Sequence, residues 1–366
     1  MFNLRILCCG TPGSGRDQYI NQMINIANIK GKKVHYYHVF DYIVDKANEM
    51  GFKIHKLNVL DVFLTRPDRI RTFREAAIND VVKKMSNKQG AHIISTPYRF
   101  EWEGASLAGL TYKEIKKLNP DIFVVVIDDV ARVKERLKQD AQWCEHKFTF
   151  GEIARWRREE INSIWDFAHS FRPPREVYIL ATEHNPQVFY DLIFERNKKK
   201  VYLSYPITGV TREIIKEERE FKQKISDHYV VFDPLTIHDW EIVSHWKKIK
   251  DGKEKLPDFF KCKIEYESGP VEYECNSKEI EFAIKDIRLQ IVDRDYKLID
   301  SSEYVIVYHL RKNISAGVVC EMVHAKGGGK MVYAMYHFEP SPFFEYHSDR
   351  IFKDEKKFTK FLQSIA

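Results

Sequence analysis

The sequence predicts an α/β protein in which two doubly wound, Rossmann-like parallel-sheet domains follow each other in tandem. Strand and helix patterns alternate over most of the 366 residues, as expected when parallel strands are joined by crossover helices. Residues 122–127, IFVVVI, form a continuous apolar run typical of a strand buried on both faces. After a polar basic run at residues 197–200, the alternation starts again.

The elements follow in order along the first half. The apolar or β-branched segments predict strands over residues 4–9, 33–37, 91–95, 122–127 and 177–181. Helical periodicity and flanking turns predict a helix from about Arg16 and further helices over 70–85, 151–171 and 186–197. We therefore expect a first domain over residues 1–197.

The second half, residues 198–366, repeats the alternation around one interruption. Strands are predicted over 201–205, 229–232, 304–308 and 331–335, and helices over 211–227, 279–300 and 316–326. The turn at 327–329 is a run of three glycines. Residues 240–278 are rich in lysine and include Pro257, Gly269 and Pro270. This stretch predicts an insertion or lid over the second domain.

Composition excludes several classes of protein. Hydrophobic residues make up 44% and charged residues 31%, which suits a packed core. The net charge of +6 has mixed signs throughout, so no basic stripe for nucleic acid is expected. No apolar run approaches the roughly 20 residues of a membrane span. The six cysteines make no disulfide framework, and Cys8 and Cys9 in a predicted buried strand favour the cytoplasm.

A glycine-rich loop follows the first predicted strand and precedes a helix, where backbone N–H groups attract phosphate. Its spacing, G-x-x-x-x-G, is that of a P-loop, and its candidate nucleotide-binding residues are Gly10, Pro12, Gly13, Ser14, Gly15, Arg16 and Asp17. Arg16 replaces the lysine that reaches the phosphates, and Asp17 replaces the hydroxyl residue that ligates Mg²⁺. The alternative is a tight turn that binds no ligand.

The wider segment of residues 1–195 resembles the archaeal type of adenylate kinase. The resemblance is carried mainly by residues 104–110, GASLAGL, which run into residues 118–122, LNPDI. It assigns further residues to two functional segments: Arg136 and Asp140 to the start of the lid, and Asp68 and Arg71 to the monophosphate-binding segment. Arg71 therefore joins the candidate nucleotide-binding residues.

The departures from that family fall where phosphoryl transfer needs positive charge and metal. Besides the changes at Arg16 and Asp17, Ser95 stands after the third strand where the family has an acidic residue. Residues 142–146, QWCEH, stand in place of the lid arginines. We expect a kinase-shaped domain that no longer transfers phosphate. Retained nucleotide binding and a purely structural or dimerising role both stay open, and ATP and Mg²⁺ are doubtful ligands of this domain.

Three motifs follow one another in the second half, in an order that can be compared with known families. They are residues 201–209, VYLSYPITG, residues 291–300, IVDRDYKLID, and residues 315–321, SAGVVCE. Together they resemble the nucleoside 2-deoxyribosyltransferase family and the related 2′-deoxynucleoside 5′-phosphate N-hydrolases. The resemblance covers about residues 199–336, with the 240–278 stretch unmatched.

The chemistry of that family explains the residue types. Breaking an N-glycosidic bond develops positive charge at C1′, which a carboxylate can trap covalently while a second acid assists. The resemblance assigns Glu321 as the nucleophile and Asp295 as the acid that orients the sugar or protonates the leaving base, with Asp293 as a rival. No cofactor is required. The alternative for Glu321 is a solvated residue favoured by the helix dipole.

Small residues and tyrosines near these carboxylates predict a substrate site. Ser315 and Gly317 lie at a helix N-terminus where a phosphate or sugar hydroxyl could dock, although an N-cap and tight turn would explain them equally. The first strand and the following turn supply the other substrate-binding candidates: Tyr202, Ser204, Tyr205, Ile207, Thr208 and Gly209. Tyr205, before Pro206, is the preferred residue for stacking on a base.

Three functions compete. The leading hypothesis is a nucleoside or nucleotide N-glycosyl hydrolase or transferase; the others are a nucleotide-binding sensor and an active nucleotide kinase with altered phosphate contacts. The resemblance implies at least a homodimer. The spacing of His238, His245, Cys262 and Cys275 matches no zinc pattern, so no metal site is predicted. The sequence leaves open hydrolase against transferase, ribose against 2′-deoxyribose, and the base.

Overall fold

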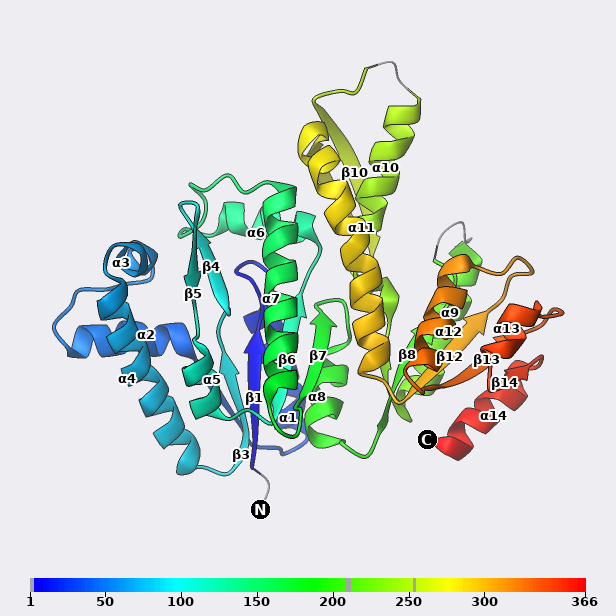
Figure 1. Ribbon diagram of the computed structural model, residues 1–366, viewed down its shortest axis with the longest axis horizontal. Helices are drawn as coiled ribbons and strands as arrows, with labels where there is room; N and C mark the ends of the chain where they lie inside the picture. Colours follow the sequence, from blue (N-terminus) through cyan, green and yellow to red (C-terminus); the bar gives the residue numbers. More distant parts are fainter. Residues whose placement is uncertain (1–2, 208–211, 253–254) are drawn as a thin grey trace. The chain divides into compact units, whose positions relative to one another are not determined.

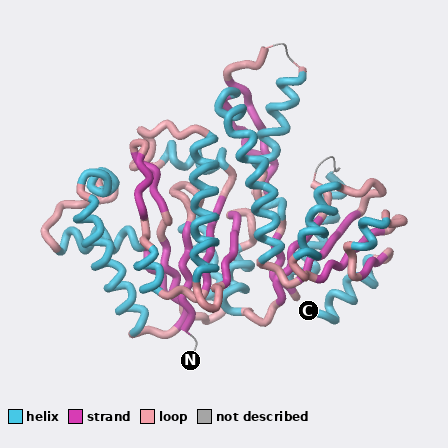
Figure 2. The backbone as a smooth tube through the Cα atoms, viewed as in Figure 1, coloured by secondary structure: helices cyan, strands magenta, loops and turns pink. Residues whose placement is uncertain are grey.

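The computed structural model describes residues 3–207, 212–252 and 255–366. Contacts divide the chain into two compact units: unit 1 comprises Met1–Pro186 and Ile237–Leu289, and unit 2 comprises Gln187–Thr236 and Gln290–Ala366. Each unit contains a five-stranded parallel sheet with helices beside it (Figure 2), which confirms the predicted fold class. The predicted second domain began at residue 198 and included the 240–278 insertion, whereas the contacts group that stretch with unit 1.

The sheet of unit 1 has the strand order β2-β3-β1-β6-β7. Its strands are β1 (Asn3–Cys9), β2 (Val34–His38), β3 (Gly90–Ser95), β6 (Ile122–Ile127) and β7 (Glu176–Ala181). β3 and β6 are buried along their whole length, as continuous apolar strands of a parallel sheet should be. A small antiparallel hairpin, β4 (Arg99–Trp102) and β5 (Ala105–Ala108), stands apart from this sheet.

Helices connect the strands of unit 1. They are α1 (Arg16–Ile29), α2 (Val39–Glu49), α3 (Val59–Thr65), α4 (Pro67–Ser86), α5 (Tyr112–Leu118), α6 (Val130–Gln139) and α7 (Phe150–Ser170). α7 packs on β6 and β7 (Figure 1). Its start is fixed by a capping box, in which Thr149 accepts from the Glu152 amide and Glu152 accepts from the Thr149 amide.

The predicted insertion folds as α10 (Asp239–Asp251), a hairpin of β10 (Phe259–Tyr266) and β11 (Gly269–Asn276), and the first part of α11 (Ser277–Asp300). Two buried carboxylates join it to the rest of unit 1 by exchanging helix caps. Asp129, before α6, accepts from the His238 amide over 2.6 Å, and Asp239 accepts from the Val130 amide over 2.8 Å. Each aspartate thus satisfies an N-terminal amide at the start of the other's helix.

The sheet of unit 2 has the strand order β14-β13-β12-β8-β9. The strands are β8 (Lys199–Ser204), β9 (Tyr229–Phe232), β12 (Tyr304–His309), β13 (Met331–Tyr336) and β14 (Arg350–Phe352). The connecting elements are α8 (Pro186–Phe194), α9 (Arg212–Ser226), a 3-10 turn at Pro234–Thr236, the end of α11, α12 (Ala316–Gly327), α13 (Pro342–Tyr346) and α14 (Glu355–Ile365). β9 is added on one side of β8 and β12 on the other, so the strand order reverses between β8 and β12, the position where open α/β sheets bind ligands.

The alternation along β8 decides which side chains can take part in a site. Val201, Leu203 and Tyr205 enter one hydrophobic core, where Phe221 stacks face to face on Tyr308 with ring centroids 4.1 Å apart. Tyr202 and Ser204 therefore leave the opposite face of the strand. That face, at the carboxyl end of β8, carries the candidate site of unit 2.

Candidate active site

The glycine-rich loop of unit 1 joins β1 to α1 and has the tight backbone that its glycines predict. Gly15 is the N-cap of α1 in the left-handed conformation, with φ 79°, which glycine adopts at little steric cost. A Cβ at Gly10 would lie 2.4 Å from the carbonyl oxygen of Val126, so the approach of β6 requires glycine there. Pro12 lies in the turn between them.

Arg16 and Asp17, the two departures from a P-loop, are paired with each other. Arg16 Nε lies 3.0 Å from Asp17 Oδ1, and Arg16 Nη1 donates to the Gly10 carbonyl over 2.9 Å. Asp17 also accepts from the hydroxyls of Ser95, over 2.7 Å, and Tyr36, over 2.8 Å. Arg16 is 6% exposed, and its guanidinium is directed at the loop backbone and Asp17 instead of at solvent.

The electrostatics of this pair keep the carboxylate charged. Burial by itself would raise the pKa of Asp17, but the charge of Arg16 and hydrogen bonds from Arg16 and Ser95 outweigh it and hold the pKa below its ordinary value. A P-loop presents a free cation to the phosphates. Here that cation is neutralised by its own neighbour in the chain.

Glu160 lies on α7 and binds this loop through its carboxylate, and the sequence analysis did not select it. Its Oε1 accepts from the amides of Gly10, over 3.0 Å, and Tyr98, over 2.7 Å, and its Oε2 accepts from the Arg99 amide over 3.3 Å. Burial raises the pKa of Glu160 to about 7 against the effect of these hydrogen bonds. A glutamate inside a charged amphipathic helix carries no local signal of such a role.

Of the other candidate residues in unit 1, some contact the glycine-rich loop and others do not. Arg136, assigned to the lid by resemblance, donates through Nη1 to the Gly13 carbonyl over 2.9 Å. Ser14 Oγ is buried without a hydrogen-bond partner in the described part of the chain. Arg71 is exposed and pairs with Glu75 over 3.5 Å. This ion pair lies within α4 and does not involve the loop.

In unit 2, two residues of β8 hold the carboxylate of Glu321. The Tyr202 hydroxyl donates to Oε1 over 3.0 Å, and Ser204 Oγ donates to Oε2 over 2.5 Å. Burial raises the pKa of Glu321 to about 8, and the charge of Asp295 acts in the same direction. Each carboxylate oxygen keeps a second lone pair, so the two hydrogen bonds orient Glu321 without blocking attack on a carbon atom.

Asp295 is the second carboxylate of this site. It is 7% exposed and pairs with the adjacent Arg294, whose Nη2 lies 2.8 Å from Oδ1. Burial raises the pKa of Asp295, and the charge of Arg294 offsets this only in part. The rival Asp293 is exposed and pairs with Lys297 over 2.5 Å. Asp295, and not Asp293, therefore acts electrostatically on Glu321.

Tyr205 does not fit the role of stacking on a base. It is 5% exposed, packs in the core of unit 2, and donates its hydroxyl to Asp233. Asp233 also accepts from Lys222 Nζ over 2.8 Å. Tyr202 is the tyrosine at the candidate site instead. Ile207 packs at the margin of the same core, and two further candidates, Thr208 and Gly209, lie outside the described residues.

The start of α12 brings Ser315 and Gly317 to the same sheet edge. Ser315 is the N-cap, but its side chain makes no capping hydrogen bond. A Cβ at Gly317 would meet only Ser315 Oγ, at 3.7 Å, so packing does not require glycine there. The Ser315 amide donates to Nε2 of His309 over 3.1 Å. His309 was not selected from the sequence because one histidine at a strand end has no distinguishing pattern.

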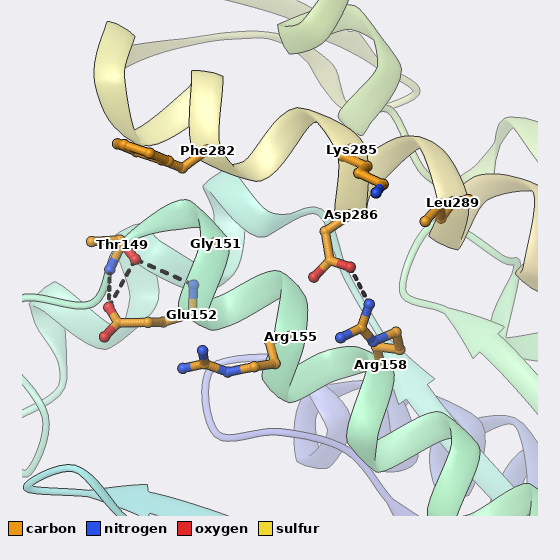
Figure 3. Close-up of a pocket in the computed structure, with 9 residues that line it drawn as sticks. All are labelled: Thr149, Gly151, Glu152, Arg155, Arg158, Phe282, Lys285, Asp286 and Leu289. Atoms are coloured by element: carbon orange, nitrogen blue, oxygen red, sulfur yellow. Dashed lines mark hydrogen bonds and ion pairs between the residues drawn. The ribbon is translucent and has the colours of Figure 1, made fainter.

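Clefts are also present among the described residues of unit 1. One, of about 570 Å³, lies between α7 and α11 (Figure 3). Arg158 pairs with Asp286 towards one end of it, and Phe282 lies towards the other. Another, of about 380 Å³, is lined by Phe148 and Phe259 together with lysines. None of the predicted site residues lines either of these clefts.

Residues 3–207, 212–252 and 255–366 contain neither a cluster of metal ligands nor a helix able to span a membrane. No group of three or more His, Cys, Asp or Glu side chains in this part is arranged to hold a metal ion. Its helices are too short or too polar to cross a bilayer. His238, one of the residues considered for a metal cluster, instead contacts Glu241 over 3.0 Å through Nδ1.

Comparisons with known proteins add little. No protein family and no curated protein matches the chain. The solved structures similar to it include TT1252 from Thermus thermophilus, with a TM-score of 0.31 and 10% identity over 50% of this chain and 89% of that one. Another is GTP-bound EhRabX3 from Entamoeba histolytica, with a TM-score of 0.21 and 11% identity over 99% of this chain and 97% of that one. With TM-scores this low, neither likeness carries an argument.

Proposed function

We propose that unit 2 breaks the N-glycosidic bond of nucleosides or nucleoside 5′-monophosphates, as a hydrolase or a transferase, through a glycosyl-enzyme intermediate on Glu321. The observation that carries the proposal is the carboxylate of Glu321, held by Tyr202 and Ser204 and influenced by the buried Asp295. The likeness of the motifs to nucleoside 2-deoxyribosyltransferases and 2′-deoxynucleoside 5′-phosphate N-hydrolases supports the same assignment.

The proposed reaction has two displacements at C1′. Glu321 attacks C1′, the C1′–N bond breaks, and its electron pair stays on the base nitrogen, which takes up a proton. We assign the proton of the leaving base to Asp295, whose pKa burial raises, which is the direction that a general acid requires. In the second displacement, water or another base attacks C1′ and the bond from C1′ to Glu321 breaks, which returns the carboxylate. The proton that the attacking group loses goes back to Asp295. Tyr202 and Ser204 keep the nucleophile aligned.

Base release from a panel of nucleosides, 2′-deoxynucleosides and their 5′-monophosphates tests this proposal. We expect Glu321→Gln to lower the rate by several orders of magnitude, because the amide has nearly the same shape but is a poor nucleophile. The matched control is Asp293→Asn, which changes an exposed carboxylate of α11 and should leave the rate unchanged. A Glu321→Gln rate within about tenfold of wild type would remove Glu321 from the mechanism.

A second function concerns unit 1. The pairing of Arg16 with Asp17 and the Gly10 carbonyl favours a nucleotide-binding or structural domain over an active kinase. The Gly10 amide donates to Glu160 and the Ser14 amide to the Thr11 carbonyl, so an anion would bind at the other amides of the loop and at the start of α1. In this second proposal, unit 1 binds a nucleotide without transferring its phosphate and regulates unit 2 or an outside partner.

A further inference from the structure

Two buried aromatic side chains fasten the loop that joins β12 to α12. His309 Nε2 accepts from the Ser315 amide over 3.1 Å, and the Tyr336 hydroxyl donates to the Lys312 carbonyl over 2.7 Å. The rings of His309 and Tyr336 meet edge to face with centroids 5.4 Å apart. Phe344 packs against both, at 6.3 Å and 4.9 Å. We call His309, Tyr336 and Phe344 the aromatic clamp.

The two side chains of the aromatic clamp that make hydrogen bonds to the loop are themselves buried. His309 is 0% exposed and Tyr336 is 1% exposed. Burial lowers the pKa of His309 to about 4, so the ring is neutral at neutral pH, and accepting at Nε2 places its proton on Nδ1. Burial also raises the pKa of Tyr336, which keeps its hydroxyl as a donor.

The clamped segment is the one that would face a ligand. Ser315 has no capping bond of its own, and Gly317 has no packing reason to be glycine. Ordering a loop at the moment of binding costs affinity, which a loop fixed in advance avoids. The aromatic clamp binds this segment at two points, the Lys312 carbonyl and the Ser315 amide. His309 lies on β12 and Tyr336 lies on β13.

We propose that His309 and Tyr336 are positioning residues that fix the backbone at the start of α12 for a phosphate or sugar hydroxyl of the substrate. The inference rests on the proposed function for the identity of the ligand. It adds two residues that touch neither the substrate nor Glu321 and act through the loop alone.

Tyr336→Phe is the sharpest test, because it removes one hydroxyl and keeps the ring contacts. We expect faster amide hydrogen exchange across residues 310–317 and a KM for a nucleoside 5′-monophosphate raised roughly threefold to tenfold, as loss of one buried hydrogen bond implies. kcat should change less than KM. The matched control is Tyr333→Phe on the same strand, whose ring packs on Tyr304 and Phe361; it should alter neither quantity.

His309 supplies a second, independent test. His309→Leu removes the acceptor and should reproduce the effect of Tyr336→Phe, whereas His309→Gln keeps an acceptor and should restore slow exchange in part. Unchanged exchange across residues 310–317 in both folded variants would overturn the inference, as would faster exchange with an unchanged KM. The exchange measurement needs no turnover, so it decides on the clamp even if no base release is found.

Discussion

A carboxyl group with a pKa of about 8 is mostly protonated at neutral pH, whereas a nucleophile must be ionised. This sets the expected pH dependence of Glu321. kcat/KM should rise as pH rises towards about 8, because the ionised fraction of the free enzyme rises with it. A pH profile of base release measures this limb directly.

Asp295→Asn extends that prediction. The charge of Asp295 helps to raise the pKa of Glu321, so removing it should move the limb to lower pH by roughly one unit. The positive charge of Arg294 also lowers the pKa of Glu321, and the substitution removes the neighbouring carboxylate that offsets this charge. A limb that stays in place, or moves to higher pH, would show that another group controls it.

Burial of Glu321 also has a cost in stability. Its pKa is raised from 4.5 to about 8, so the folded state keeps a proton in a window where the unfolded state has lost it. The associated stability is present below pH 4.5 and lost as pH rises through about 8.

Glu321→Gln should therefore raise Tm at alkaline pH and change it little at acidic pH. The gain should be roughly 10 °C, since each unit of the raised pKa corresponds to about 1.4 kcal/mol and one kcal/mol to about 2–4 °C in a domain of this size. Thermal unfolding at about pH 5 and about pH 9 measures the difference. An equal shift at both ends would contradict the assigned burial.

How far the candidate site could be predicted depends on individual residues. The order of the motifs was enough to select Glu321 and Asp295, because both carry the chemistry in their side chains. It was not enough to choose between Tyr202 and Tyr205. That choice depends on which face of β8 packs into the core, and two candidate tyrosines on one strand satisfy the sequence pattern equally well.

The start of α12 leads us to predict which substrate the protein prefers. The partial positive charge of a helix N-terminus favours a phosphate over a neutral hydroxyl, so we expect the 5′-monophosphate to be used better than the nucleoside. A preference of roughly 30- to 150-fold in kcat/KM corresponds to about 2–3 kcal/mol. Equal or better use of the nucleoside would contradict it.

A single methyl group provides the matched test of that docking position. The structure has room for a Cβ at residue 317, so Gly317→Ala should keep Tm unchanged and weaken the monophosphate more than the nucleoside. Loss of Tm would instead assign the glycine to folding, and equal weakening of both substrates would place the phosphate elsewhere.

Other elements show where local patterns stop being informative. The sequence predicts continuous strands such as β6 well, since their burial on both faces appears as an unbroken apolar run. The hairpin β10–β11 lies in a lysine-rich stretch, although Phe260, Cys262 and Ile264 alternate with exposed residues along it. The cap exchange between Asp129 and Asp239 joins residues about a hundred positions apart, and no local pattern indicates such a contact.

For the molecule as a whole, we predict a division of labour between the units. The full chain should form no ADP from ATP, Mg²⁺ and any nucleoside monophosphate, because Arg16 is held by Asp17 and by the loop itself. An assay of ADP formation run beside the base-release assay checks this on one preparation. ADP formation that Arg16→Ala abolishes would contradict the prediction and assign a kinase to unit 1.

Unit 2 is built from two stretches of chain, Gln187–Thr236 and Gln290–Ala366, and this has a consequence for synthesis. β8 and β9 leave the ribosome well before β12, the strand that pairs with the other edge of β8. At about 5–20 residues per second, the intervening chain takes several seconds to emerge. A two-stranded sheet is at best marginally stable, so the edge of β8 stays without its partner during that interval, whereas every strand of the unit 1 sheet has already been made.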